Sequence, residues 1–451
     1  MPHSRKIVGR IVPGTDPASK QHSSDGTERT QPKKFQNDVV WSIVGVCATG
    51  VSGILLSLLV GLFYDAAALG VFNQVFAAYI FFSQLAVGGL HYSALKSIAE
   101  YAERPEHHAR IVLSALAPAL VLSLIATVLY FCARHSAGRL LESPGVAIGL
   151  AWSAPGLFFF SLNKVLLSTM NGLRYMRAFA LLQSLRPLVM ILTLIALTLN
   201  GAVASTLPAV LSAAEIVVFL AALCVMRRHL IGSLTGFWSQ VRAHVNFGAR
   251  GFAGGFLTEL NTRVDVLMLG FFMTDHIVGL YSFAAILVEG FFQLLVVLRN
   301  NFNPILVQLI ASRRFTDLRL RIQHGKLVTY VVAAGVTVAA IGLFPLGQHF
   351  LSGYLPGGSA LGHSWPLFSI LMIGVLLGAG YVPFSNLLLQ AGRPGLHTCM
   401  LGLVVLSNAL GNLLLIPWFG AIGAAVATAF SFVFSAILLR VFTQRFIGVR
   451  I

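Results

Sequence analysis

The chain has 451 residues, of which 57% are hydrophobic and only 10% charged, and its mean hydropathy is +0.82. A soluble domain carries about 25% charged residues, so this composition excludes a water-soluble enzyme or a soluble nucleic-acid-binding protein. The 31 Lys and Arg residues outnumber the 15 Asp and Glu residues, which gives a formal net charge of +16. In a soluble protein that excess of positive charge would suggest a nucleic-acid partner. The positions of the basic residues along the chain therefore decide how the excess is interpreted.

The first 38 residues form a polar segment rich in Ser, Thr, Lys, Arg and Pro, including KQHSSDGTERTQPKK at 20–34. We expect residues 1–38 to be a disordered cytoplasmic tail, because such a composition cannot bury a core. The segment has no apolar stretch of the kind found in signal peptides, so we expect no cleavable signal. The four cysteines show neither paired nor metal-like spacing, which predicts small core residues and no metal site.

Apolar runs of about 20 residues, the length that crosses a hydrocarbon core of roughly 30 Å, recur after this tail. Twelve such runs are predicted to be transmembrane helices: 39–63, 68–92, 111–132, 146–167, 178–199, 204–226, 248–272, 277–298, 327–350, 366–389, 396–416 and 419–441.

The positive charges fall on one side of this predicted topology. If the N-terminus is cytoplasmic, 26 of the 31 Lys and Arg residues lie in the tail and inside loops, and only Arg134 and Arg139 lie in outside loops. This asymmetry is typical of multi-pass membrane proteins, whose inside loops are basic. It predicts a multi-pass membrane protein with both termini in the cytoplasm, and it removes the reason to expect a nucleic-acid partner.

The two halves of the chain repeat each other. A shift of 209 residues aligns Gly70 with Gly279 and Gln84 with Gln293, and a shift of 219 aligns Gly201 with Gly420. Paired repeats of this kind are typical of transporters. We therefore predict an all-α polytopic protein with two pseudo-symmetric six-helix lobes around a central cavity. The predicted parts are an N-lobe (39–226), a cytoplasmic linker (227–247), a C-lobe (248–442) and a cytoplasmic C-terminus (443–451).

Three stretches resemble a known family: NTRVDVLMLGFFMTDHIVGLYSFA (261–284), NLLLIPWFGAIGAAVATAFS (412–431) and LGVFNQVFAAYIFFSQLAVGGLHYSALKSIAEY (69–101). They are similar to the polysaccharide exporter (Wzx-type flippase) branch of the multidrug/oligosaccharidyl-lipid/polysaccharide exporter (MOP) superfamily. The resemblance implies a flippase that moves polyprenyl-diphosphate-linked oligosaccharides across the bacterial inner membrane for exopolysaccharide biosynthesis, by alternating access. It also implies membrane lipids and other polysaccharide assembly proteins as partners. A drug/cation antiporter, a lipid II flippase and a membrane-embedded polysaccharide polymerase remain alternatives.

Basic side chains inside the spans are candidate ligands for a diphosphate. A charge at bilayer depth costs at least about 2.5–3.5 kcal/mol, so such a residue is expected to have a function. Arg186 lies about 12 Å into its span and precedes Pro187, and arginine offers paired donors to phosphate oxygens. The alternative is a structural ion pair with Glu215. Lys164 either contacts substrate or extends its amine to the headgroups.

The span 248–272 is the most polar. Helical spacing places Arg250, Asn261 and Asp265 on one face that should line the cavity, and Glu259 and Arg263 at its edge are spaced to pair with each other. The alternative for Asp265 is a structural pair with Arg250 or Arg263.

Acidic side chains without a basic neighbour on their own helix can carry a proton. Glu215 and Glu289 meet this description, and with Glu259 they are the candidates for proton or sodium coupling, the alternative being a base on another helix. No phosphate-binding loop, zinc-protease motif or nucleophile motif occurs in the sequence. We therefore expect a transporter without enzymatic activity, without a bound cofactor and without a metal centre.

Overall fold

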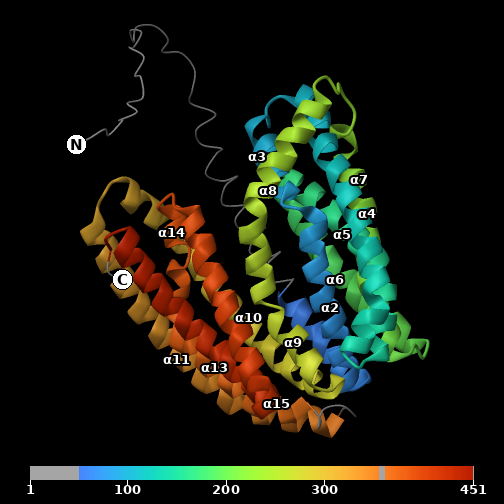
Figure 1. Ribbon diagram of the computed structural model, residues 1–451, viewed down its shortest axis with the longest axis vertical. Helices are drawn as coiled ribbons and strands as arrows, with labels where there is room; N and C mark the ends of the chain where they lie inside the picture. The colour runs from blue at the N-terminus through green and yellow to red at the C-terminus, as the bar shows by residue number, and fades with distance from the viewer. Residues whose placement is uncertain (1–49, 355–360, 450–451) are drawn as a thin grey trace.

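The computed structural model describes residues 50–354 and 361–449, and within these ranges the regular structure is entirely helical (Figure 1). The predicted tail (1–38) and the first part of the run 39–63 lie outside the described residues. The helices are Gly50–Phe63, α2 (Ala66–Val87), α3 (Leu90–Glu100), α4 (His108–Leu140), α5 (Pro144–Gly172), α6 (Met176–Leu199), α7 (Ala209–Met226), α8 (Phe237–Asn261), α9 (Val264–Phe272), α10 (Asp275–Ala311), α11 (Phe315–Tyr354), α13 (Trp365–Ala379), α14 (Leu387–Gln390) and α15 (Pro394–Phe446).

Nine helical segments in the described part of the chain are long and apolar enough to cross a membrane, and Gly50–Phe63 is a shorter apolar helix. The α-helical, multi-pass class predicted from the sequence is therefore confirmed, while the count of twelve spans stays a prediction. The helix α15 contains two of the predicted runs, because Gly420 interrupts its helical geometry with φ 57°. Gly201, its counterpart in the first half, also has a positive φ of 68°, so the internal repeat extends to the backbone.

Three predicted spans are broken where the sequence pattern suggested one continuous helix; one of them, 366–389, divides into α13 and α14 after Ala379. The run 68–92 divides into α2 and α3 at Gly88 and Gly89, which have φ of 54° and 75°. Glycine adopts this left-handed region without steric cost. The run 248–272 divides into α8 and α9 at Thr262 and Arg263. The last two breaks change which side chains share a face, and the second of them alters the predicted site.

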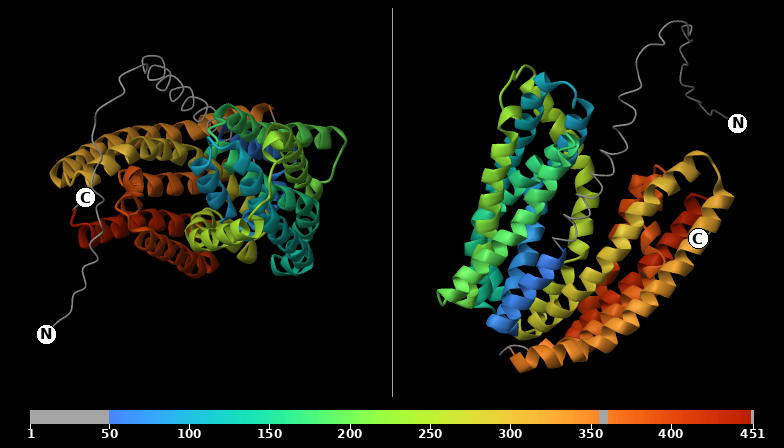
Figure 2. Two further views of the ribbon diagram at one scale, coloured as in Figure 1. Left: turned by 90° about the horizontal axis from the view of Figure 1, so that it is seen from above. Right: turned by 180° about the vertical axis from the view of Figure 1, so that it is seen from behind.

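The helices form two bundles that meet at one end and diverge toward the other (Figures 1 and 2). The helices α2 to α7 form one bundle, which we call the N-arm, and α11 to α15 form the other, the C-arm. The helices α8, α9 and α10 connect the arms, and α8 contacts α3 and α4 as well as α15. The diverging end carries the connection between α3 and α4 and the hairpin between α10 and α11, which hold basic loops.

At the end where the arms meet, α2 and α10 cross in backbone contact. A Cβ atom on Gly70 would overlap the carbonyl of Asp275, and one on Gly279 would overlap the carbonyl of Ala66. Asp275 also links the arms through its side chain, because its Oδ1 accepts from Gln74 Nε2 (2.6 Å) and its Oδ2 from Ser143 Oγ (2.7 Å). The glycine pair that revealed the repeat is thus the point of closest approach between the arms.

Near the diverging end, α8 packs on α3 through a buried histidine. The His244 ring has no exposed surface, and its Nδ1 lies 2.8 Å from Ser93 Oγ. Burial lowers the pKa of His244 to about 4, although a backbone hydrogen bond with Ile111 acts in the opposite direction. The ring is therefore neutral in the folded protein throughout the physiological range.

Acid is expected to weaken this contact. Histidine in an unfolded chain has a pKa near 6.5, so below that pH His244 binds a proton in the unfolded chain but not in the folded chain. The stability contributed by neutral His244 is complete above pH 6.5 and falls by about 3 kcal/mol as the pH drops toward 4. Unfolding temperatures of the detergent-solubilised protein at pH 7.5 and 4.5 measure the loss. His244→Gln should reduce the loss, and His349→Gln, at an exposed position, should leave it unchanged.

Candidate functional site

The centre of the N-arm holds an ion pair between α6 and α7. Arg186 Nε lies 2.5 Å from Glu215 Oε1, and a second guanidinium nitrogen donates to Oε2 at 3.3 Å. The Glu215 side chain is 4% exposed and that of Arg186 is 25% exposed. Asn163 of α5 donates to the same carboxylate at 2.8 Å. The pair that the sequence left as the alternative is therefore present, and Glu215 has a base on the neighbouring helix.

Lys164 lies beside this ion pair and does not extend toward the headgroups. Its amine donates to Gln84 Oε1 of α2 at 3.1 Å and lies 5.8 Å from the centre of the Phe160 ring. The guanidinium of Arg186 lies over the same ring at 5.2 Å. Two cations thus flank one aromatic face, an arrangement that stabilises each cation through the ring quadrupole.

Arg263 occupies the break between α8 and α9, where it faces both arms. Its guanidinium lies 3.7 Å from Glu289 of α10 and 5.0 Å from the centre of the Phe76 ring of α2. The side chains are 21% and 40% exposed, so the pair is open to a ligand from one side. The predicted pair between Glu259 and Arg263 is absent from the described contacts, because the turn at Thr262 ends the helical spacing on which it depended.

The remaining polar residues of α8 differ in exposure. Arg250 is exposed and makes no ion pair within the described part of the chain. Glu259 and Asn261 are partly buried, and the Asn261 side-chain oxygen has no hydrogen-bond partner among these residues. Glu259 is close enough to Lys164 to act on it electrostatically, which brings α8 to the cation pair of the N-arm.

Asp265 does not belong to this polar face, contrary to the prediction from helical spacing. It is buried inside the C-arm, where its Oδ1 accepts from Asn408 and Asn412, both at 2.7 Å. Its Oδ2 accepts from Thr428 at 2.9 Å and from Tyr281 at 3.1 Å. Because the helix breaks at Thr262 and Arg263, side chains of α9 no longer follow the helical spacing of α8, and Asp265 does not share a face with Arg250 and Asn261. Neither Arg250 nor Arg263 pairs with Asp265. Among the described residues, all hydrogen-bond donors to this carboxylate are neutral.

The structure therefore divides the predicted residues into two places. Eight of them lie in the N-arm or on α8, the α8–α9 break and α10: Lys164, Arg186, Arg250, Arg263, Glu215, Glu259, Glu289 and Asn261. Asp265 lies apart with its four donors. The candidates missed by sequence reasoning are Gln84, Asn163, Asn408, Asn412 and Thr428. Asn408 and Asn412 carried a usable signal, because two amides four residues apart share one face of an otherwise apolar helix.

Comparison with known proteins agrees with this architecture. Residues 36–308 match the family model described as polysaccharide biosynthesis protein, which covers more than half of the chain. The chain belongs to this family. Part of it is 27% identical over 180 residues to the probable flippase AglR of Haloferax volcanii. That match covers 39% of this chain and 36% of the relative, so it spans about a third of the relative's length.

Solved transporters share the fold of this family member. The lipid II flippase MurJ in an inward closed conformation superposes with a TM-score of 0.69 at 15% identity, covering 90% of this chain and 87% of that one. An inward-facing multidrug resistance MATE family transporter of the MOP superfamily superposes with a TM-score of 0.70 at 15% identity, covering 90% and 94%. The chain is thus a multi-pass membrane protein with the fold of MOP superfamily transporters.

Proposed function

We propose that the protein is a flippase that translocates a polyprenyl-diphosphate-linked oligosaccharide across the inner membrane for surface polysaccharide biosynthesis. The family match over residues 36–308 carries this proposal, and the partial similarity to a probable flippase supports it. Transport is by alternating access, with the basic, diverging end of the arms toward the cytoplasm. Both termini then lie in the cytoplasm, as positive inside loops favour.

The bases of the N-arm and of the α8–α9 break are suited to the diphosphate. Arg186 and Lys164 come from the N-arm, and Arg263 lies at its boundary with the C-arm. Arginine binds phosphate oxygens through parallel hydrogen bonds, and an entering diphosphate can compete with the partly exposed Glu289 for Arg263. The sugar then occupies the polar space between the arms, while the lipid tail stays in the membrane.

Ion coupling, by protons or sodium, is proposed to depend on Asp265. Glu215 and Glu289 each have an arginine partner in the structure, whereas Asp265 is buried among neutral donors. A buried carboxylate needs compensation for its charge, which a proton or a small cation can supply. Amide and hydroxyl oxygens are suitable ligands for a hard cation once the Asn408 and Asn412 side chains rotate.

Asp265→Asn is expected to remove the response of transport to an ion gradient. The substitution keeps the side-chain size and removes the charge, so the protein should fold while gradient-driven transport falls at least tenfold. Translocation of a fluorescent lipid-linked sugar in proteoliposomes, with and without proton or sodium gradients, measures this response. Glu103→Gln, at an exposed position between α3 and α4 and away from the candidate site, is the control. An unchanged gradient response in Asp265→Asn would contradict the assignment.

A drug/cation antiporter is the second candidate, because a MATE transporter superposes as well as the lipid II flippase does. Deletion of the protein distinguishes the two. A flippase predicts loss of surface polysaccharide with lipid-linked repeat units retained on the cytoplasmic side, and restoration of both by the intact chain. Altered drug sensitivity with normal surface polysaccharide would instead favour the antiporter.

A further inference from the structure

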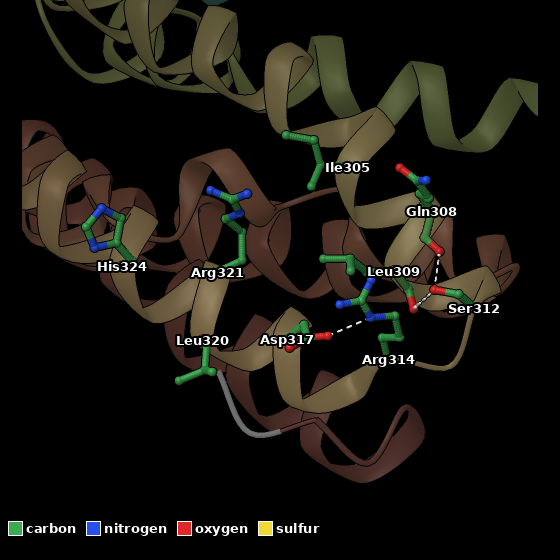
Figure 3. A pocket seen from close by; sticks show the side chains of 9 residues that line it. All are labelled: Ile305, Gln308, Leu309, Ser312, Arg314, Asp317, Leu320, Arg321 and His324. Carbon is green, nitrogen blue, oxygen red and sulfur yellow. Dashed lines mark hydrogen bonds and ion pairs between the residues drawn. The ribbon is translucent and has the colours of Figure 1, made fainter.

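A pocket of about 620 Å³ lies at the diverging end of the C-arm, in the hairpin that joins α10 and α11 (Figure 3). Ile305 and Leu309 of α10 and Leu320 of α11 supply its apolar lining. Arg314, Arg321 and His324 supply its basic lining, and Gln308 and Ser312 add polar groups. None of these residues belongs to the candidate site between the arms.

The pocket is strongly biased toward anions. Residues 299–326 contain six Lys and Arg residues and a single acid, Asp317. That acid is occupied by Arg314, whose Nε lies 2.6 Å from the Asp317 carboxylate. Arg321 and His324 are exposed and have no partner in the described ranges 50–354 and 361–449. Figure 3 shows the guanidinium groups of Arg314 and Arg321 on the same side of the hairpin, with Ile305 and Gln308 across from them.

The depth of the pocket matches that of lipid headgroups. The apolar part of α10 ends near residue 298 and that of α11 begins near residue 327. At 1.5 Å per residue, Ile305, Leu320 and Arg321 lie roughly 10 Å beyond the hydrocarbon core, and His324 lies roughly 5 Å beyond it. The headgroup layer extends roughly 5–7 Å beyond the hydrocarbon core, so His324 lies within it and the long side chain of Arg321 can extend back into it.

Helical spacing places exposed apolar side chains of α11 on the same face as His324, on the membrane side of the pocket. On α11, Leu327 is 64% exposed and Val331 is 65% exposed, and Val328 between them is also exposed. These side chains face outward from the helix at the depth of acyl chains. A ligand with a phosphate and attached hydrocarbon chains can therefore place the phosphate at Arg321 and His324 and its chains along this strip.

We propose that this pocket binds the headgroup of an anionic phospholipid from the surrounding leaflet. Arg321 and His324 hold the phosphate, Gln308 and Ser312 hydrogen-bond the polar headgroup, and the exposed Leu327 and Val331 contact the acyl chains. The bound lipid anchors the α10–α11 hairpin, and with it the C-arm, to the membrane surface. This site is separate from the proposed path of the transported lipid, so it does not depend on the substrate assigned above.

The test measures lipid binding to the purified full-length protein in detergent, by native mass spectrometry with phosphatidylglycerol or phosphatidylcholine. Wild type should retain phosphatidylglycerol in preference to phosphatidylcholine. Arg321→Gln should weaken phosphatidylglycerol binding about fivefold, the order expected for one basic residue near an anionic lipid. Arg319→Gln is the matched control, because Arg319 is exposed on the same helix but does not line the pocket. It should change binding less than twofold.

Other outcomes overturn the proposal. Equal effects of Arg319→Gln and Arg321→Gln would mean that the general charge of the hairpin attracts the lipid. Equal retention of the two lipids by wild type would exclude headgroup recognition. Tighter binding of farnesyl diphosphate than of phosphatidylglycerol, lost in Arg321→Gln, would reassign the pocket to the transported lipid. His324→Gln provides a second variant at another pocket position, and unfolding temperatures without added lipid show that each variant is folded.

Discussion

Replacing Arg186 with alanine is expected to abolish export of surface polysaccharide, by two effects that must be separated. Glu215 is buried and accepts hydrogen bonds from Arg186 and Asn163. Removing the arginine leaves an uncompensated buried carboxylate, which costs about 3–5 kcal/mol in comparable ion pairs. Loss of export in Arg186→Ala alone could therefore come from misfolding as well as from loss of a diphosphate ligand.

The double variant Arg186→Met with Glu215→Gln separates the two effects. It removes both charges together, and replacing a buried ion pair by neutral groups of similar volume is often neutral for stability. Asn163 can still donate to the amide oxygen of the new glutamine. If Arg186 binds the diphosphate, the double variant should reach the membrane at normal levels and still fail to export polysaccharide.

The readouts are surface polysaccharide, accumulated lipid-linked repeat units and the amount of protein in the membrane. Arg228→Ala, at an exposed position outside the cation cluster, is the control and should export normally. Arg186→Lys keeps the charge but loses paired hydrogen bonds, so partial export is expected. Normal export by the folded double variant would assign Arg186 a structural role and move the diphosphate to Lys164 and Arg263.

The class of fold could be predicted from the sequence because it depends on features that are spread over many residues and do not depend on any single contact. Small errors in helix boundaries do not change three of these features: the length of the apolar runs, the concentration of positive charge on one side, and the repeated glycines Gly70 and Gly279. The helical breaks at Gly88 and at Thr262 were not predicted, and the first of them lies at a close contact with a distant segment. Gly89, for example, lies against the backbone of Gly248.

The candidate site was predicted in its residue types but not in its pairings. Intramembrane charges are costly wherever they occur, so Arg186, Arg263 and Asp265 could be recognised from the sequence alone. Which acid meets which base depends on the packing of helices far apart in the chain. Arg186 and Glu215 are 29 positions apart and lie on successive helices, α6 and α7, so no local spacing rule predicts that contact. For Asp265, the helical break at Thr262 and Arg263 moved the side chain from the predicted polar face of α8 to the interior of the C-arm.

Gly279→Ala is expected to stop alternating access by opening the closed end of the two arms. The new methyl group would overlap the carbonyl of Ala66, a backbone atom that cannot move without displacing α2. Close-packed helices lose their contact when such overlap is forced, so α2 and α10 must separate near Asp275. That separation also breaks the hydrogen bonds that Gln74 and Ser143 donate to Asp275. Transport should fall at least tenfold while the protein remains in the membrane.

A cysteine at Ala77, which is buried on α2, reports the state of this end in a background without the native cysteines. In the parent it should resist a membrane-impermeant maleimide added from outside, and in Gly279→Ala it should become labelled. Gly342→Ala is the matched control, because a Cβ at that glycine of α11 meets no neighbouring atom. Asp275→Asn keeps the glycine crossing and weakens only the side-chain link, so it should label to an intermediate extent. If Gly279→Ala transports normally and its reporter stays protected, then the Gly70–Gly279 crossing does not hold the arms together. The expected graded labelling across the three variants would show that the backbone contact and the Asp275 link together hold this end closed.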